Sequence, residues 1–157
     1  MKHSIPAFIL TAALSIGSAP AFGFDVVDTM SRSTSFKTFS AALRSSGLAD
    51  TLKNPGPFTV FAPSDQAIAK LPKGTWETLT KDKARLTDIL AHHVVPGKIV
   101  SAEAKPGEIP TLDGKPLRLE SDNGMISVGD AKVTQSDILA DNGVIHEIDT
   151  LVLPGEE

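Results

Sequence analysis

The sequence contains no cysteine, which excludes several kinds of chemistry. A chain without thiols forms no disulfide, offers no thiolate to a metal ion and has no cysteine nucleophile. Tyrosine is also absent and there is one tryptophan, so the sequence gives little support to a stacking-rich site for a flat ligand. The 157 residues are 41% hydrophobic, and that is enough for one domain with a core that needs no disulfides.

An excess of positive charge is missing as well. The chain has 15 lysines and arginines against 19 aspartates and glutamates, a formal net charge of -4. Domains that bind nucleic acid usually carry a basic stripe, so we expect no nucleic-acid partner. The slight negative charge favours solubility but selects no particular partner.

The familiar signatures of catalysis do not occur. There is no Gly-x-Ser-x-Gly elbow, no phosphate-binding glycine loop and no His-Glu-x-x-His zinc motif. The Asp-Asn-Gly turns that begin at Asp122 and Asp141 lack the ligand series of a calcium loop. The sequence therefore predicts a protein that is not an enzyme, with no metal site and no cofactor.

Residues 1–23 have the pattern of a secretory signal peptide. Lys2 gives a positive start, an apolar stretch follows, and small residues lead to expected cleavage after Ala21 or Gly23. The alternatives are a buried helix or a membrane anchor, but the apolar stretch is shorter than the roughly 20 residues that span a bilayer. We expect an exported protein, periplasmic or secreted, whose mature chain has no membrane span.

Helices are predicted for the first half of the mature chain. Ser35 is a suitable N-cap for one of them, and Gly47 suits its C-terminal end. Ser64 is expected to cap a helix that runs to Leu71, and a further helix is expected to continue until Pro96-Gly97 closes it. The apolar residues at helical spacing are Phe24, Val27, Met30, Phe36, Phe39, Leu43, Leu86, Ile89 and Leu90, with His93 on the same face as the last three.

Strands are predicted for the second half. Alternating apolar residues at 117–119 and 126–128 flank an Asn-Gly turn and indicate a hairpin. Residues 144–148 and 151–153 are expected to form a last strand pair or one bent strand. One earlier strand is expected at 58–61. Helices followed by strands indicate an α+β arrangement, which we assign to a single domain over residues 24–157.

Two segments then point to a family. Residues 57–68 (Pro-Phe-Thr-Val-Phe-Ala-Pro-Ser-Asp-Gln-Ala-Ile) and 142–154 (Asn-Gly-Val-Ile-His-Glu-Ile-Asp-Thr-Leu-Val-Leu-Pro) resemble the two signature segments of the fasciclin (FAS1) domain family. Between them, residues 92–97 (His-His-Val-Val-Pro-Gly) are similar to the family's Tyr-His-Val-Val-Pro-Gly, with His92 in place of the tyrosine. The order and spacing of these motifs resemble a single-domain, secreted, bacterial-type member.

The resemblance implies a FAS1 fold, a β-wedge or sandwich of about seven strands with packed helices. It also implies an exported, non-enzymatic module for cell-surface or extracellular protein–protein adhesion, with self-association as an open alternative for the partner. Two other functions remain as alternatives. One is a carrier of an apolar small ligand such as a lipid or pigment, and the other is an uncharacterised envelope hydrolase.

Four residues are candidates for partner binding: His92, His93, Asp137 and Ile138. The resemblance implies them because the Tyr-His segment and an Asp-Ile pair belong to adhesion motifs of animal members. A structural role competes in each case. His93 is expected to be a packed, hydrogen-bonded core residue, and His92, about 100° away on the helix, is expected to be exposed. Asp137 is expected to form a turn through its own side chain and Ile138 to fill the core.

His146 has a structural interpretation only. Strand alternation places it on one face with Val144 and Ile148, opposite Ile145 and Glu147. No serine or acid stands beside it at a known catalytic spacing, so we expect it to fix local packing.

Overall fold

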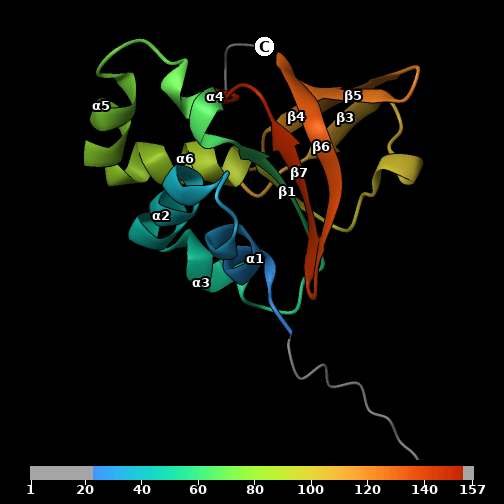
Figure 1. Ribbon diagram of the computed structural model, residues 1–157, viewed down its shortest axis with the longest axis horizontal. Helices are drawn as coiled ribbons and strands as arrows, with labels where there is room; N and C mark the ends of the chain where they lie inside the picture. The colour runs from blue at the N-terminus through green and yellow to red at the C-terminus, as the bar shows by residue number, and fades with distance from the viewer. Residues whose placement is uncertain (1–22, 154–157) are drawn as a thin grey trace, which may run out of the picture.

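The computed structural model describes residues 23–153, and the predicted signal peptide up to residue 22 lies outside this range. In the described residues, helices dominate the first half and strands the second, and β1 lies between two helices as the sequence predicts (Figure 1). The elements are α1 (Val26–Arg32), α2 (Lys37–Ser46), α3 (Leu48–Leu52), β1 (Phe58–Pro63), α4 (Asp65–Ala69), α5 (Thr75–Lys81), α6 (Lys83–His92), β2 (Val94–Pro96), the short 3-10 helix η1 (Ser101–Glu103), β3 (Gly107–Pro110), β4 (Pro116–Asp122), β5 (Met125–Val128), β6 (Ala131–Ala140) and β7 (Gly143–Ile148).

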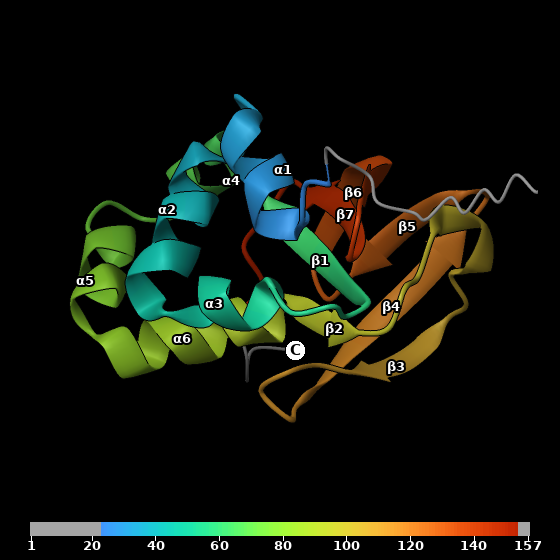
Figure 2. The same ribbon diagram turned by 90° about the horizontal axis from the view of Figure 1, so that it is seen from below.

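The strands form one seven-stranded sheet in the order β2-β1-β7-β6-β5-β4-β3. Strands β1 and β7, second and third from the β2 edge, pair in parallel, and the other neighbours are antiparallel. Strand β6 belongs to both halves of the sheet, because its first residues pair with β5 while the remainder pairs with β7. The sheet therefore bends into a wedge, and the six α-helices lie beside one of its halves (Figures 1 and 2).

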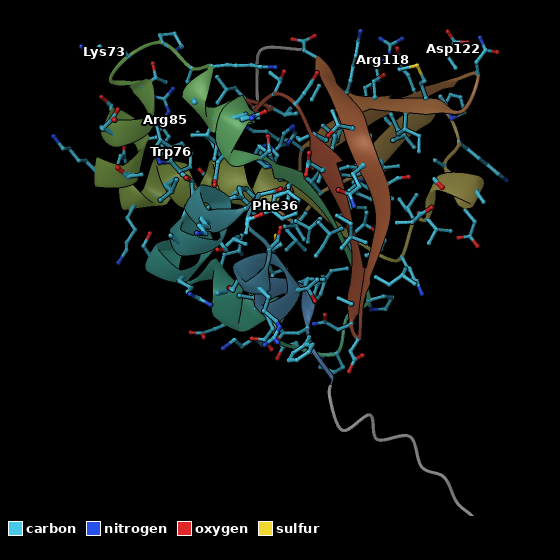
Figure 3. The ribbon with its side chains drawn as sticks, in the orientation of Figure 1. Phe36, Lys73, Trp76, Arg85, Arg118 and Asp122 are labelled. Carbon is cyan, nitrogen blue, oxygen red and sulfur yellow. The ribbon has the colours of Figure 1, made fainter. Side chains whose placement is uncertain are left out.

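Two apolar clusters fill the interior. The larger lies between the helices and the sheet and includes Phe36, which Figure 3 shows among the helices. The second lies inside the wedge and includes Phe61 and Ile148. Ile145 belongs to the first cluster and Ile148 to the second, so β7 is buried on both faces. This burial explains why its sequence is a nearly continuous apolar run.

The helix ends confirm some predicted caps and correct one. The Ser64 side chain accepts a hydrogen bond from the Ala67 amide at the start of α4, and Gly47 adopts the left-handed conformation at the end of α2. The predicted Ser35 cap is wrong, because α2 has no local side-chain cap. Instead the Asp65 carboxylate accepts a hydrogen bond from the Thr38 amide at 2.8 Å. A residue of α4 thus satisfies the free N–H group at the start of α2.

Three predicted boundaries are also wrong. Helix α6 ends at His92 rather than at Pro96-Gly97, because Val94–Pro96 forms β2 and pairs with the buried strand β1. Helix α4 ends at Ala69, two residues before the expected Leu71. The last apolar segment, residues 151–153, forms no strand, although Leu151 and Val152 are buried.

No helix within the described range 23–153 has the length and apolar character needed to cross a bilayer.

Substitution of Gly143 tests the parallel pairing of β1 and β7. A Cβ at this position would lie 2.0 Å from the Phe58 carbonyl oxygen of β1, so Gly143→Ala must push the two strands apart. We expect it to lower the free energy of unfolding by about 3 kcal/mol in urea titrations. Gly124→Ala is the control, because its Cβ would meet nothing within 4 Å and only its positive φ of 83° adds strain. That variant should lose about 1 kcal/mol, and equal losses in the two variants would contradict the role given to Gly143.

Candidate binding surface

His93 lies in the interior and links α6 to the C-terminal segment. Its Nδ1 is 2.8 Å from the Ile89 carbonyl oxygen, and its Nε2 accepts a hydrogen bond from the Val152 amide at 3.0 Å. The ring of Phe39 meets it edge-on at 5.8 Å. These partners assign the neutral tautomer with the proton on Nδ1. Burial lowers the pKa of His93 to about 4, although the hydrogen bond to Ile89 opposes the shift.

His92 is also buried, which corrects the expectation that it is exposed. Only 1% of its surface is accessible, because the ring turns toward the turn after β3. There its Nδ1 lies 3.3 Å from the Asp113 carboxylate. Burial alone would raise the pKa of Asp113, but hydrogen bonds from the Thr111 hydroxyl and the Lys115 amide outweigh it and lower that pKa.

His146 occupies the wedge beside a bulge in β6. Its neighbours on β7 pair with Gln135 and Ile138, and the register shift between those two residues leaves Asp137 opposite the imidazole. The Asp137 amide donates to Nδ1 at 3.2 Å, and Nε2 donates to the Ile99 carbonyl oxygen at 2.7 Å. The Phe61 ring stacks on the imidazole at 5.4 Å, which confirms that His146 faces the second apolar cluster.

Asp137 itself adopts a left-handed conformation, with φ of 59°. The expected turn through its own side chain is wrong, because the carboxylate instead reaches the segment before β3. It accepts hydrogen bonds from the Ser101 amide at 2.7 Å and from the Ser101 hydroxyl. These bonds hold the pKa of Asp137 below its ordinary value. Ile138 is half-buried and packs against the larger cluster, as the sequence predicts.

The segment that contains Ser101 is tied at three points. Thr59 of β1 donates its hydroxyl hydrogen to the Gly97 carbonyl and accepts the Ile99 amide, at 2.7 and 2.8 Å. His146 holds the Ile99 carbonyl and Asp137 holds Ser101, as described above. We call residues 97–103 the tethered loop, because side chains of β1, β6 and β7 fix it across the wedge.

Exposed apolar side chains gather at the C-terminal end of β6, where the Phe24 carbonyl oxygen accepts the Asp141 amide. Strand β5 pairs with Ala131 and Lys132 only, so in the described chain the outer edge of β6 beyond Lys132 has no strand partner. Leu139 on this part of β6 is 63% exposed and Phe24 is 38% exposed. Both line an open cleft of about 360 Å³ together with Thr29, Arg32, Ala140 and Asp141. We define the β6 surface as Phe24, Arg32, Asp137, Ile138 and Leu139.

The structure separates the four residues that the sequence singled out. Asp137 and Ile138 belong to the β6 surface, whereas the rings of His92 and His93 are buried inside the protein. Sequence reasoning missed Phe24 and Leu139 as surface residues, since Phe24 was assigned to a helical apolar pattern and Leu139 was not singled out. Within residues 23–153, no three metal-ligating side chains gather into a group.

Comparisons with known proteins agree on one family. The fasciclin domain matches residues 34–154 of this chain. Protein sll1483 of Synechocystis is 42% identical over 82% of this chain and 73% of its own length. The transforming growth factor-beta-induced protein ig-h3 of Sus scrofa is 35% identical over 82% of this chain, which spans only 19% of that protein.

A solved structure shows the same fold. The FAS1 domain pair from the insect cell adhesion molecule fasciclin I superposes with a TM-score of 0.72 and 19% sequence identity. The match covers 82% of this chain and 50% of the solved one. The mixed α+β architecture with a bent seven-stranded sheet is therefore the FAS1 fold that the sequence predicted.

The buried His93 predicts a loss of stability in mild acid. Its folded pKa of about 4 is below the unfolded value of 6.5, so its contribution is complete above pH 6.5 and declines as the pH falls toward 4. Between pH 7 and 4.5 this amounts to about 2 kcal/mol. His93→Gln keeps a donor and an acceptor but does not titrate. Urea unfolding at both pH values should therefore show a smaller pH-dependent loss in the variant than in the wild type, and identical losses would contradict this role.

Proposed function

This chain belongs to the fasciclin domain family, and from that premise we propose that it is an exported, non-enzymatic module that binds a protein or cell-surface partner. Members of the family are known in adhesion proteins, and nothing in the comparisons indicates catalysis. Export is supported by the signal-peptide pattern of residues 1–23. The partner of this chain is itself a proposal, because the chain spans only a small part of relatives such as ig-h3.

The observation that carries this proposal is the exposed apolar pair Leu139 and Phe24 beside an unpaired strand edge. Single exposed apolar side chains are ordinary, but two of them that line one cleft form a patch that a partner can bury. The outer edge of β6 adds backbone N–H and C=O groups that no strand of the described chain uses. Arg32, whose guanidinium lies 4.2 Å from the Phe24 ring centroid, adds a positive group at the rim.

Asp137 and Ile138 contribute differently from the role that animal adhesion motifs suggest. The Asp137 carboxylate already accepts hydrogen bonds from Ser101, so we assign it to shaping the surface in this conformation. Ile138 anchors the strand against the larger cluster. His92 and His93 hold the turn after β3 and the C-terminal segment in place, so we assign them no part in the β6 surface.

The two alternative functions gain less support. A carrier needs room for its ligand, and apolar side chains occupy both the wedge and the space between helices and sheet. A hydrolase needs an arranged pair of catalytic groups, and the described carboxylates with resolved pKa shifts, Asp113, Asp137 and Asp149, are all held in their charged form by hydrogen bonds.

Leu139→Ser tests the proposed surface. Purified, fluorescently labelled protein is incubated with the producing cells, and the amount retained after washing is measured against concentration. We expect this variant to bind at least tenfold more weakly, a change of about 1.4 kcal/mol, because the patch loses its most exposed apolar side chain.

Met125→Ser is the matched control. Met125 is 62% exposed, almost the same as Leu139 at 63%, but it lies at the β4–β5 turn. It should retain wild-type binding, and both variants should retain the wild-type free energy of unfolding. Equal weakening by the two substitutions, or no retention of the wild-type protein at any concentration, would count against the β6 surface.

A further inference from the structure

His146 stands between the two segments that frame the β6 surface. On one side its Nε2–H donates to the Ile99 carbonyl of the tethered loop, and on the other its Nδ1 accepts the Asp137 amide of the β6 bulge. The ring is 2% exposed and stacks on Phe61. One imidazole therefore holds together parts of the chain that are 47 and 9 residues away from it.

This arrangement requires a neutral imidazole. A neutral ring has one donor nitrogen and one acceptor nitrogen, and both are used here. In the protonated ring both nitrogens are donors, so Nδ1–H would face the Asp137 N–H at a distance of 3.2 Å. Two donors at that separation repel each other, so protonation breaks the contact that shapes the bulge.

An acceptor for the new Nδ1–H is available on the same residue. The Asp137 carboxylate is charged, and it is bound to the Ser101 amide and hydroxyl while the ring is neutral. A protonated imidazole offers it a hydrogen bond in which donor and acceptor both carry a charge, whereas both Ser101 donors are neutral. The carboxylate thus has two alternative partners, Ser101 and His146, and the charge on the ring decides between them.

We propose that mild acid transfers the Asp137 carboxylate from Ser101 to His146 and thereby releases the tethered loop from β6. The transfer reshapes the β6 surface, so acidity regulates partner binding there. This inference rests on the proposed function for its biological consequence, but the exchange of hydrogen-bond partners is a property of the protein alone. The bistable element is the Asp137 side chain, and the charge change that biases it is the single proton on His146.

The surroundings of His146 favour this exchange over simple unfolding. The titratable group that faces the ring from β6 is Asp137, while β1 presents the Phe61 ring and the tethered loop presents the Ile99 carbonyl. Burial lowers the pKa of His146, and the contacts with Ile99 and Asp137 oppose that shift. The ring therefore takes up its proton below pH 6.5, and it does so beside a carboxylate that can receive the new N–H.

Amide hydrogen exchange of Ser101, followed by NMR from pH 7 to pH 4.5 and corrected for the intrinsic rate, tests the transfer directly. The Ser101 amide is protected while it donates to Asp137. If uptake of one proton by His146 frees this amide, its protection should fall about tenfold for each pH unit below the midpoint of that protonation. The nitrogen shifts of the His146 ring, recorded in the same samples, should report the Nε2–H tautomer at pH 7 and the same midpoint.

His146→Gln is the decisive variant. A glutamine amide can donate to Ile99 and accept from Asp137 but takes up no proton, so Ser101 should stay protected over the whole range. Ser101 protection that is unchanged while the His146 ring is protonated would overturn the proposal, as would an equal loss in His146→Gln. So would global unfolding before the ring takes up a proton. If the variant does not fold, coincidence of the two wild-type midpoints supports the transfer, and different midpoints contradict it.

Cell retention at pH 7 and pH 5 separates this inference from the proposed function. Wild-type binding should change at least threefold between the two pH values, and that of His146→Gln should stay constant. Absence of binding at both pH values would contradict the proposed function, yet the exchange data would still decide whether the carboxylate moves. Binding that is equal at both pH values would refute acid regulation.

Discussion

Phe58 of β1 lies beside Gly143 of β7, and from there the two strands run in parallel to Pro63 and Ile148. Most of the described residues come between these two strands in the sequence. In space, the other elements are arranged around the pair. One face of the strands receives the helices and the other forms the inside of the wedge. The pairing also sets His146 against Phe61, and the Phe61 amide in turn bonds to the His93 carbonyl oxygen at 2.8 Å. The close approach at Gly143 is thus the constraint from which the positions of the buried histidines follow.

Much of this fold was predictable because its signals are local. Apolar periodicity indicated the helices, Gly47 and Ser64 marked two of their ends, and the Asn123-Gly124 turn identified the β4–β5 hairpin. Strand β2 was missed, since Val94 and Val95 gain their strand geometry from pairing with β1, a partner more than thirty residues away. The cap of α2 was missed for the same reason, because Asp65 reaches it only in the folded protein.

The candidate surface was less predictable than the fold. The sequence pointed to Asp137 and Ile138, but the partner of Asp137 is Ser101, 36 residues earlier, and no pattern in either segment announces it. His92 was expected to be exposed because helical geometry sets it apart from His93, and its burial depends on Asp113 of a separate turn. Phe24 was expected on a helical apolar face and Leu139 was not singled out. The two side chains form one surface because the Phe24 backbone bonds to Asp141 at the end of β6. Each of these contacts joins segments that local spacing cannot relate.

The buried imidazoles perform a task that small exported proteins often assign to covalent bridges. His92, His93 and His146 each connect a secondary-structure element to a distant loop, and the chain has no thiol with which to do so otherwise. These hydrogen bonds form without an oxidant, and a reductant does not break them. The protein can therefore fold to the same structure in a reducing or an oxidising compartment. It needs no oxidoreductase to complete its folding.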